Sequence, residues 1–370
     1  MPRANRRDLS FATFNLLNFQ AIGGLTYSNT PPFADDAEGR AAFDRKVDWI
    51  AEKLVEIDAE VIGFQELWSA GALHLAFQRA GLDGHYDLIA RDAPGRGRPQ
   101  VALAVRKGED GLSQLLPNAA YHSDFPPDFR FDCLRESRGA EEEITVTISK
   151  FSRPVIMAQI QPTGTRPKPP VVTVLVAHLK SKAPARLSRV GDPPVLSIYP
   201  TITKSAVAHI RRVMEAGALR ALLDGIMKAD DPAELTPTVV LGDLNDGSLS
   251  VSTELIAAQP GYRVIEKSRT GNRSDAGLYS VEKLQQYRSL RHVYYTHIYK
   301  NQMESLDHIL VSEEFYDHAR KRHWSFREME ILNDHLNHET KPELRKSGAS
   351  DHGIVRAYFD WNPIPQNLTG

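Results

Sequence analysis

The sequence predicts an α/β protein in which two mixed β-sheets pack face to face and helices cover their outer faces. Two observations support this fold class: short β-branched runs recur along the chain, and helical apolar stripes separate only some of them. A doubly wound fold would alternate strand and helix more regularly. Between residues 86 and 178 several strands follow one another with little helix, which favours two packed sheets.

The individual elements follow from the spacing of apolar residues. Eight runs predict strands, several of them apolar on both faces; they span residues 9–15, 61–65, 101–105, 155–160, 171–178, 239–241, 309–311 and 354–359. Two stripes with intervals of three or four residues predict helices. The first stripe is Phe43, Val47, Ile50, Leu54 and Ile57, and the second is Val207, Ile210, Met214, Ala218 and Leu222. Each stripe gives its helix one face that can pack on a sheet.

We expect a single domain, residues 1–370, with loop insertions. Length alone would allow two domains of roughly 150 residues. However, the sequence shows no internal repeat and no linker of the length that a second domain would need. Insertions are predicted at about 20–40, 161–170, 183–203, 268–280 and 331–350. The Pro-rich segment 161–170 is expected to join two neighbouring strands as a hairpin loop.

Composition and charge exclude some classes of function. The chain has 45 basic and 47 acidic side chains and a net charge of −2. It is therefore not a strongly basic protein that coats nucleic acid, and a polyanion would have to bind in a locally basic groove. The single cysteine, Cys133, cannot form an intrachain disulfide. Because neither a signal peptide nor a run of roughly 20 apolar residues is visible, we expect a cytoplasmic protein without membrane contact.

Polar side chains of related chemistry lie at the ends of the predicted strands. In chain order they are Asn15, Gln65-Glu66, His178, Asp243, Asn245, Asp307 and Asp351-His352. Strand ends at one edge of a sheet can converge on a common pocket. Carboxylate and carboxamide oxygens are hard ligands that suit Mg²⁺ or Mn²⁺, and the set lacks the Cys or clustered His that zinc prefers. The expected cofactor is Mg²⁺, which Mn²⁺ can replace.

These residues belong to a set of motifs that resembles a known superfamily. The motifs are Phe14-Asn15, Gln65-Glu66, His178, Gly242-Asp243-Leu244-Asn245, Ser305-Leu306-Asp307-His308 and Ser350-Asp351-His352. In this order they resemble the endonuclease/exonuclease/phosphatase superfamily, which includes pancreatic-type deoxyribonucleases and apurinic endonucleases. The resemblance spans residues 9–359 and implies a four-layer α/β sandwich.

The resemblance also implies a role for each carboxylate and amide. Glu66 would be the principal metal ligand, with Asn15 and Asp351 at or beside the metal. Asp243 and Asn245 would align or deprotonate the attacking water and hold the phosphoryl group. A phosphodiester hydrolase needs these functions because charge on the phosphate oxygens must be neutralised and a water aligned.

The two histidines of the motif set are implied to bind phosphate or transfer protons. His352 would be oriented by Asp307. Pancreatic-type enzymes support the histidine equivalent to His178 with a carboxylate just before the strand at 101–105, where this chain has Pro99-Gln100. This departure weakens the expectation that His178 is a general acid.

Three basic residues are candidates for substrate binding. Arg153 resembles the arginine that contacts phosphate before a sheet strand in pancreatic-type enzymes. Lys180 and Lys182 follow His178 and are placed to meet a polyanion. Together they would supply the local positive potential that the net charge does not.

Other aromatic and histidine residues favour structural explanations. Tyr294-Tyr295 and Tyr299 precede the Asp307 motif, and strand packing is favoured over stacking on nucleic-acid bases. His335 and His338 have metal-like spacing, but their polar surroundings favour an ordinary loop.

The motif variants favour a nuclease that acts on DNA or RNA. Gly-Asp-Leu-Asn-Asp at 242–246 and Leu-Asp-His-Ile-Leu-Val-Ser at 306–312 look most like bacterial nuclease-type members of the superfamily. The signatures of inositol phosphatases are absent from the sequence. A sphingomyelinase-like enzyme, or another hydrolase of small phosphodiesters or phosphomonoesters, remains the alternative. A non-catalytic binding module is not favoured, because Glu66, Asp243 and His352 are all retained, and no obligate protein partner is evident.

Overall fold

The computed structural model describes residues 8–108, 111–135, 143–165, 167–187, 200–228, 235–262, 276–289, 295–336 and 348–364. Parts of the predicted insertions at 161–170, 183–203, 268–280 and 331–350 lie outside these ranges, as do Tyr294 and His338.

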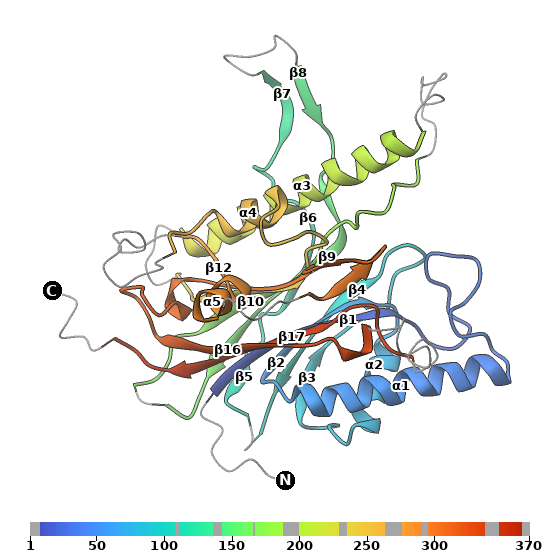
Figure 1. Ribbon diagram of the computed structural model, residues 1–370, viewed down its shortest axis with the longest axis horizontal. Coiled ribbons are helices and arrows are strands. Elements are labelled where there is room, and N and C mark those ends of the chain that lie inside the picture. Colours follow the sequence, from blue (N-terminus) through green and yellow to red (C-terminus); the bar gives the residue numbers. More distant parts are fainter. Residues whose placement is uncertain are drawn as a thin grey trace.

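One β-sheet has six strands and contains the first and the last strand of the chain (Figure 1). In spatial order the strands are β16 (Trp324–Leu332), β17 (Ile354–Trp361), β1 (Asp8–Phe19), β2 (Val61–Leu67), β4 (Gln100–Arg106) and β3 (Tyr86–Ile89). β1 and β2 run parallel, whereas the other neighbours are antiparallel. The sheet is therefore mixed.

The second sheet has seven strands and is also mixed, because β10 and β11 run parallel. In spatial order its strands are β12 (Tyr279–Ser280), β15 (Asp307–Val311), β11 (Thr238–Asp243), β10 (Val172–His178), β9 (Lys150–Pro162) and β5 (Ser113–Leu115), with β6 (Ala120–Asp124) paired to β9. β9 and β10 are antiparallel neighbours. The Pro-rich segment between them therefore joins two paired strands.

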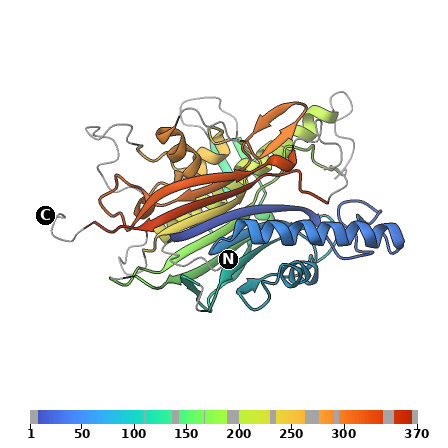
Figure 2. The same cartoon turned by 60° about the horizontal axis from the view of Figure 1, so that its bottom comes forward.

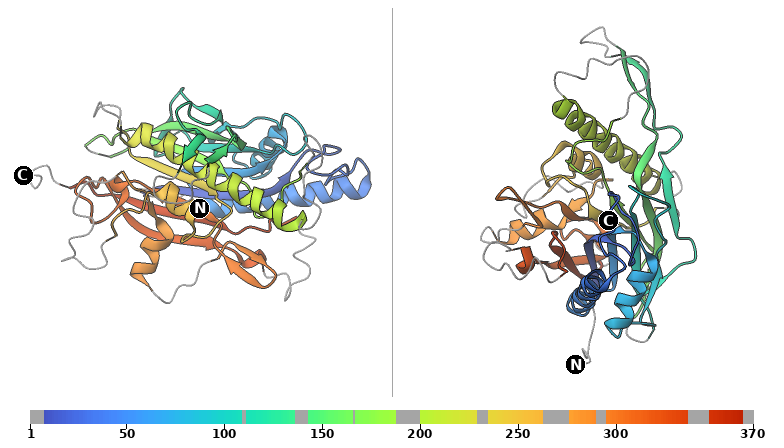
Figure 3. Two further views of the ribbon diagram at one scale, coloured as in Figure 1. Left: turned by 90° about the horizontal axis from the view of Figure 1, so that it is seen from above. Right: turned by 90° about the vertical axis from the view of Figure 1, so that its right-hand side faces the viewer.

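Four helices lie on the outer faces of the two sheets (Figures 2 and 3). They are α1 (Ala37–Ile57) and α2 (Ala70–Arg79) on the first sheet, and α3 (Pro200–Met227) and α4 (Val251–Ala257) on the second. Another helix, α5 (Val281–Arg288), follows β12 and directs Val281 and Leu284 into the apolar cluster between the sheets. Short 3-10 turns span Glu313–Phe315 and Asp334–Leu336. Two hairpins stand apart from the sheets: β7 (Phe131–Arg135) with β8 (Glu143–Val146), and β13 (His297–Tyr299) with β14 (Gln302–Glu304).

Alternating side chains along the strands build three separate apolar layers. In β10, Val174 and Val176 point into the layer between the sheets, whereas Leu175 points into the layer under α3 and α4. In β2, Val61 belongs to the layer between the sheets and Ile62 to the layer under α1 and α2. This alternation follows from the two-residue period of a strand. Two sheets and two helical layers with three cores between them confirm the predicted four-layer sandwich.

α1 shows how local sequence sets the limits of an element. The side chain of Asp36 accepts a hydrogen bond from the backbone N–H of Gly39 at 2.7 Å, which caps the helix N-terminus. Asp58 ends the helix in a left-handed conformation with φ of 43°. All five residues of the predicted stripe are buried between these two caps.

Each predicted strand lies at one of the observed strands, usually shorter by a few residues. The sequence reasoning expected several strands between residues 86 and 178 but gave no bounds for β3 or for β5 to β8. It gave no bounds for β12 to β14 or β16, and it did not predict α2, α4 or α5. The approximate insertion bounds overlap observed elements by a few residues: 20–40 the start of α1, 161–170 the end of β9, 183–203 the start of α3, 268–280 the strand β12 and 331–350 the end of β16. In the described parts of the chain, no helix is both long and apolar enough to cross a membrane.

Candidate active site

Three of the predicted site residues form a row across neighbouring strands of the seven-stranded sheet. His178 ends β10, Asp243 ends the parallel strand β11, and Asp307 begins the antiparallel strand β15. In the strand register, His178 lies beside Asp243, and Asp243 lies beside Asp307. All three side chains are buried. The row meets the six-stranded sheet at Asn15 of β1, whose Nδ2 donates to Oδ2 of Asp243 at 3.0 Å.

Gly242 places Asp243 by allowing a close approach between two strands. A Cβ atom at this position would lie 2.0 Å from the backbone carbonyl oxygen of Ala177 in β10. Two residues after Asp243, Asn245 has a left-handed backbone with φ of 56°, a conformation that Asn tolerates better than most residues. The Gly-Asp-Leu-Asn sequence therefore suits both the strand pairing and the turn that follows it.

Asp243 lies at the centre of the site. Its Oδ1 accepts a hydrogen bond from the backbone N–H of Asn245 at 2.8 Å. Nε2 of His178 and Nε2 of His352 lie 3.5 Å and 3.8 Å from its Oδ2. Burial raises the pKa of Asp243 to about 7, although the charge of His352 opposes the rise. A carboxylate that titrates near neutral pH can exchange a proton with water during a reaction.

His352 and Asp307 form a buried ion pair. Nδ1 of His352 lies 2.8 Å from Oδ2 of Asp307. Burial alone would lower the pKa of His352, but the Asp307 carboxylate, followed by Asp243, raises it well above its usual value. His352 is therefore a cation at neutral pH, and its Nε2 is directed toward Asp243. This is the geometry expected of an imidazole that Asp307 orients.

Several buried polar groups hold this ion pair in place. Oγ of Ser350 donates to the backbone carbonyl of Asn15 at 2.7 Å and accepts from the backbone N–H of His352 at 3.1 Å. Nε2 of His335 donates to the carbonyl of His352 at 2.7 Å. The prediction of an ordinary polar loop at His335 is wrong, because this residue is buried and its ring packs edge-on against Trp49.

His178 is uncharged at neutral pH. Burial lowers its pKa well below the usual value, and the nearby charge of Arg153 lowers it further. Its Nδ1 has no hydrogen-bond partner among the described residues. Gln100 does not support His178 in the way that a carboxylate supports the equivalent histidine of pancreatic-type enzymes. Its side chain binds Arg91 and the backbone carbonyl of Arg98 instead. A neutral His178 can contact a phosphate oxygen but cannot supply a proton as a general acid.

Beside this cluster, the carboxylate of Asp351 lies close enough to Glu66 for its charge to act on it. Glu66 has a left-handed backbone with φ of 59°, which is strained for glutamate. The backbone N–H of Asn18 donates to its Oε2 at 2.9 Å. Burial raises the pKa of Glu66, and the charge of Asp351 raises it further. Because the two like charges disfavour each other, a divalent cation bound by these oxygens would remove the repulsion.

Asn15 lies beside this carboxylate pair but is engaged at both ends of its amide. Its Oδ1 accepts a hydrogen bond from the backbone N–H of Leu17 at 3.0 Å, and its Nδ2 binds Asp243. The structure therefore gives Asn15 a direct contact with Asp243, whereas the resemblance placed it at or beside the metal. Nδ2 of Asn245 in turn donates to the carbonyl of Leu179 at 3.0 Å.

Arg153 reaches the site from β9, together with a tyrosine that the sequence reasoning missed. Its guanidinium donates to the carbonyl of Leu179 and to the hydroxyl of Tyr27, both at 3.0 Å. The ring of Tyr27 packs edge-on against Trp68 at a centroid distance of 5.1 Å. Tyr27 lies within the predicted insertion 20–40, and no local motif marks it as a site residue.

Glu215 of α3 is a second residue that the sequence did not reveal. It is fully buried, and its carboxylate accepts from the backbone N–H of Ser152 at 2.9 Å and from that of Lys180 at 2.7 Å. These bonds tie the helix to β9 and to the end of β10. A glutamate in an amphipathic helix gives no signal in the sequence that it is buried.

The structure does not support the prediction that Lys180 and Lys182 face a polyanion. Nζ of Lys180 donates to the carbonyls of Ser181 and Ala183 at 3.0 Å and 2.9 Å. Nζ of Lys182 binds both carboxylate oxygens of Glu304 at 2.8 Å. Both ammonium groups thus have partners within the protein, and the positive charge of Lys182 is already matched.

His297 is another histidine that was not predicted for the site. Its ring lies 4.9 Å from the ring of His352, and the two residues form an isolated β-bridge. His297, Asp351 and His352 place one ligand atom each within 4.8 Å of one another, as do Asp243, Asp307 and His352. The sequence reasoning predicted that the nearby Tyr299 packs against other residues of a strand. This prediction is wrong, because Tyr299 is 61% exposed.

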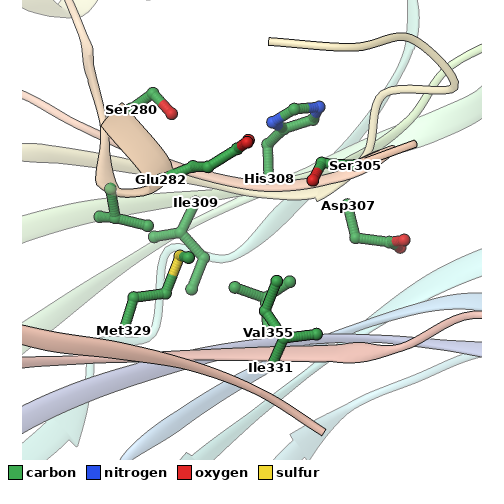
Figure 4. A pocket seen from close by; sticks show the side chains of 10 residues that line it. Ser280, Glu282, Ser305, Asp307, His308, Ile309, Met329, Ile331 and Val355 are labelled. Carbon is green, nitrogen blue, oxygen red and sulfur yellow. The ribbon is translucent and has the colours of Figure 1, made fainter. Parts of the chain in front are cut away.

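A cavity of about 10 Å³ lies behind Asp307 and is too small for a substrate. Figure 4 shows Glu282 and His308 on one side of it, with the carboxylate of Asp307 turned away from Glu282. Burial raises the pKa of Glu282. The volume is about that needed for one water molecule, so this cavity belongs to the interior and not to the site.

Comparison with known proteins agrees with this arrangement. Residues 12–352 match the sequence model of the Endonuclease/Exonuclease/phosphatase family. The chain belongs to this family. The search of curated proteins produced no match. The fold and the buried carboxylate–histidine cluster are accordingly those of a hydrolase of this superfamily.

Several solved structures share the fold at low sequence identity. The catalytic domain of human Nocturnin, with a bound sulfate anion, has a TM-score of 0.51 and 15% identity, over 97% of this chain and 96% of that one. ANGEL2, a 2′,3′-cyclic phosphatase, has a TM-score of 0.51 and 14% identity over 95% of both chains. TDP2 from D. rerio, complexed with a single-strand DNA product, has a TM-score of 0.50 and 14% identity, over 95% of this chain and 99% of that one. These likenesses confirm the predicted fold class.

Proposed function

We propose that the chain is a Mg²⁺-dependent phosphodiesterase, most specifically a nuclease that hydrolyses DNA or RNA. The observation that carries the proposal is Asp243, a buried carboxylate whose pKa is raised to about 7 and which contacts Asn15, Asn245 and the two histidines. A base that titrates near the working pH combines a useful ionised fraction with an appreciable proton affinity.

In the proposed reaction, Asp243 accepts a proton from the water that attacks phosphorus. Asn15 holds the carboxylate from one side, and the backbone of Asn245 holds it from the other. The imidazolium of His352, fixed by Asp307, stabilises the negative charge that develops on the phosphate oxygens. His178 contacts the phosphate as a neutral group. The bond between phosphorus and the leaving oxygen then breaks with its electron pair on that oxygen, which takes a proton from solvent, and Asp243 returns its proton to solvent.

Glu66 and Asp351 are the residues that would hold the metal. Their carboxylates offer hard oxygen ligands, and burial, followed by the charge of Asp351, raises the pKa of Glu66. A bound Mg²⁺ supplies charge neutralisation at the phosphate and leaving oxygens. The residues present therefore fit the cation that the sequence predicts.

Two observations support nucleic acid as the substrate class. The motif variants at 242–246 and 306–312 resemble bacterial nuclease-type members, and the D. rerio TDP2 structure of the same fold contains a single-strand DNA product. The paired states of Lys180 and Lys182 favour a second candidate, a small phosphoester such as the 2′,3′-cyclic phosphate named for ANGEL2. A small substrate needs fewer free cations than a long polyanion does.

The deciding experiment compares substrates under three metal conditions. Purified protein is incubated with plasmid DNA, single-stranded DNA, RNA, a nucleoside 2′,3′-cyclic phosphate and a sphingomyelin analogue, each with Mg²⁺, Mn²⁺ or EDTA. We expect cleavage of at least one nucleic acid with Mg²⁺ and none in EDTA. Cleavage restricted to the cyclic phosphate or to the lipid analogue would exclude the nuclease assignment.

A further inference from the structure

We propose that the β13–β14 hairpin is a nucleobase-binding element in which Tyr299 stacks on a base next to the scissile phosphate. The inference rests on the proposed function, because it names the part of the substrate that this rim of the site would bind. It starts from the observation that Tyr299, which sequence reasoning assigned to packing, is 61% exposed.

The base of the hairpin is fixed directly to the active site. The ring of His297 lies against His352, and the backbone N–H of Gly353 donates to the carbonyl of Thr296 at 2.6 Å. Oγ1 of Thr296 accepts from the backbone N–H of Asp307 at 3.2 Å. A group that binds this hairpin is therefore held in a defined position relative to the Asp307–His352 pair.

The pairing of the two strands shows which face the tyrosine occupies. His297 pairs with Glu304, and Tyr299 pairs with Gln302. Because side chains alternate along a strand, these four residues share one face of the hairpin. On that face His297 touches His352 and Glu304 binds Lys182. Tyr299 lies two residues farther along, about 7 Å from His297 at the usual rise of a strand.

The hairpin closes next to Tyr299 in a tight two-residue turn. Its two central residues, Lys300 and Asn301, have φ of 49° and 63°, as a type I′ turn requires. Nζ of Lys300 lies 5.5 Å from the centre of the Tyr299 ring, where a cation stabilises the ring and can also attract a backbone phosphate. Met303, on the opposite face of the hairpin, is 60% exposed.

A nucleobase is the ligand class that this chemistry fits best. An exposed tyrosine offers a flat surface for stacking, and such stacking tolerates any base. Other tyrosines of the chain, such as Tyr279 and Tyr316, are buried and stack on each other at a centroid distance of 4.1 Å. Tyr299 has no such burial, although it stands at the rim of the site.

The test measures binding separately from turnover. Fluorescence anisotropy with Mg²⁺ gives the Kd of a labelled octathymidylate and of a strand of equal length without bases, using an Asp243→Asn background to prevent cleavage. Tyr299→Ala should raise the Kd of octathymidylate roughly tenfold, within the range found for single stacked bases, and leave the baseless strand unchanged. Tyr299→Phe should restore the affinity. Tyr287→Ala, at a tyrosine on α5 that is 47% exposed, is the matched control and should have no effect.

The outcomes separate this inference from the proposed function. An unchanged Kd in Tyr299→Ala, or an equal loss for both strands, would overturn the base site even if the wild-type chain cleaves nucleic acid. A base-dependent effect of Tyr299 in a protein that cleaves no nucleic acid would support the binding site and refute the nuclease. Thermal unfolding of Tyr299→Ala should match that of the parent, because the side chain is exposed.

Discussion

Replacing Asp243 by asparagine should make the metal-free protein more stable at pH 8 while it abolishes most of the activity. The folded-state pKa of Asp243 is raised from 3.8 to about 7, so the folded protein binds this proton more tightly than the unfolded chain. The stability that this group contributes is therefore lost as pH rises from about 4 through about 7. The neutral amide of Asp243→Asn removes that dependence.

The size of the effect follows from the shift and from the contacts. A rise of about three pKa units corresponds to about 4 kcal/mol of penalty once Asp243 is ionised, at 1.36 kcal/mol for each unit. The amide cannot accept both existing hydrogen bonds, from Asn15 and from the backbone of Asn245, and losing one costs about 1 kcal/mol. Loss of the anion also withdraws support from the His352 cation. The net stabilisation expected at pH 8 is about 2 kcal/mol.

Urea unfolding in EDTA at pH 4.5 and pH 8 measures this difference. The stability of the variant relative to wild type should increase with pH. Asp246→Asn is the matched control. Burial disfavours the ionised form of Asp246 as well, but hydrogen bonds from Ser252 and Arg212 and the charge of Arg212 outweigh burial and lower its pKa. It should therefore destabilise the protein at pH 8. Greater destabilisation of Asp243→Asn at pH 8 than at pH 4.5 would refute the reasoning.

Further predictions concern the metal, the strand pairing and the basic residues. Glu66→Gln should weaken Mg²⁺ affinity at least about tenfold, measured by calorimetry; an unchanged affinity would remove Glu66 from the metal site. Gly242→Ala should destabilise the fold by about 3 kcal/mol in urea, since its Cβ would meet a backbone oxygen at 2.0 Å; wild-type stability would contradict that contact. Lys182→Ala should leave the salt dependence of single-stranded DNA binding unchanged, because Glu304 already pairs the lysine. Arg153→Gln should reduce the slope of log affinity against log salt by about 0.7. A larger change of this slope in Lys182→Ala than in Arg153→Gln would contradict the choice of Arg153 as the residue that binds phosphate.

The fold could be predicted from the sequence where strands are buried on both faces. The runs at 171–178 and 239–241 became adjacent central strands because each has Val or Leu directed into two different apolar layers. Edge strands and hairpins such as β5, β6 and β13 are short and partly exposed, so their sequences carry no apolar periodicity. Tertiary pairing, which no local pattern encodes, makes them strands.

The site could be predicted from the sequence where a carboxylate directly follows or precedes an apolar strand, as Asp243 and Asp307 do. The partners of these groups could not, because they arrive from distant segments. Tyr27 reaches Arg153 across 126 positions of sequence, and Lys182 meets Glu304 across 122. Whether a lysine faces solvent or a nearby carboxylate depends on such long-range contacts, which only the folded chain reveals.

The central claim is that Asp243 and a bound metal hydrolyse nucleic acid. The most direct test compares the cleavage of a 5′-labelled single-stranded DNA oligonucleotide by the wild-type chain and by Asp243→Asn. The reaction is run in ¹⁸O-labelled water with Mg²⁺ or EDTA, and the products are analysed by mass spectrometry. We predict cleavage that requires Mg²⁺, one ¹⁸O atom in each new phosphate end, and a rate lower by roughly 10²- to 10⁴-fold in the variant. Full activity in EDTA, or a near wild-type rate in Asp243→Asn, would contradict the account.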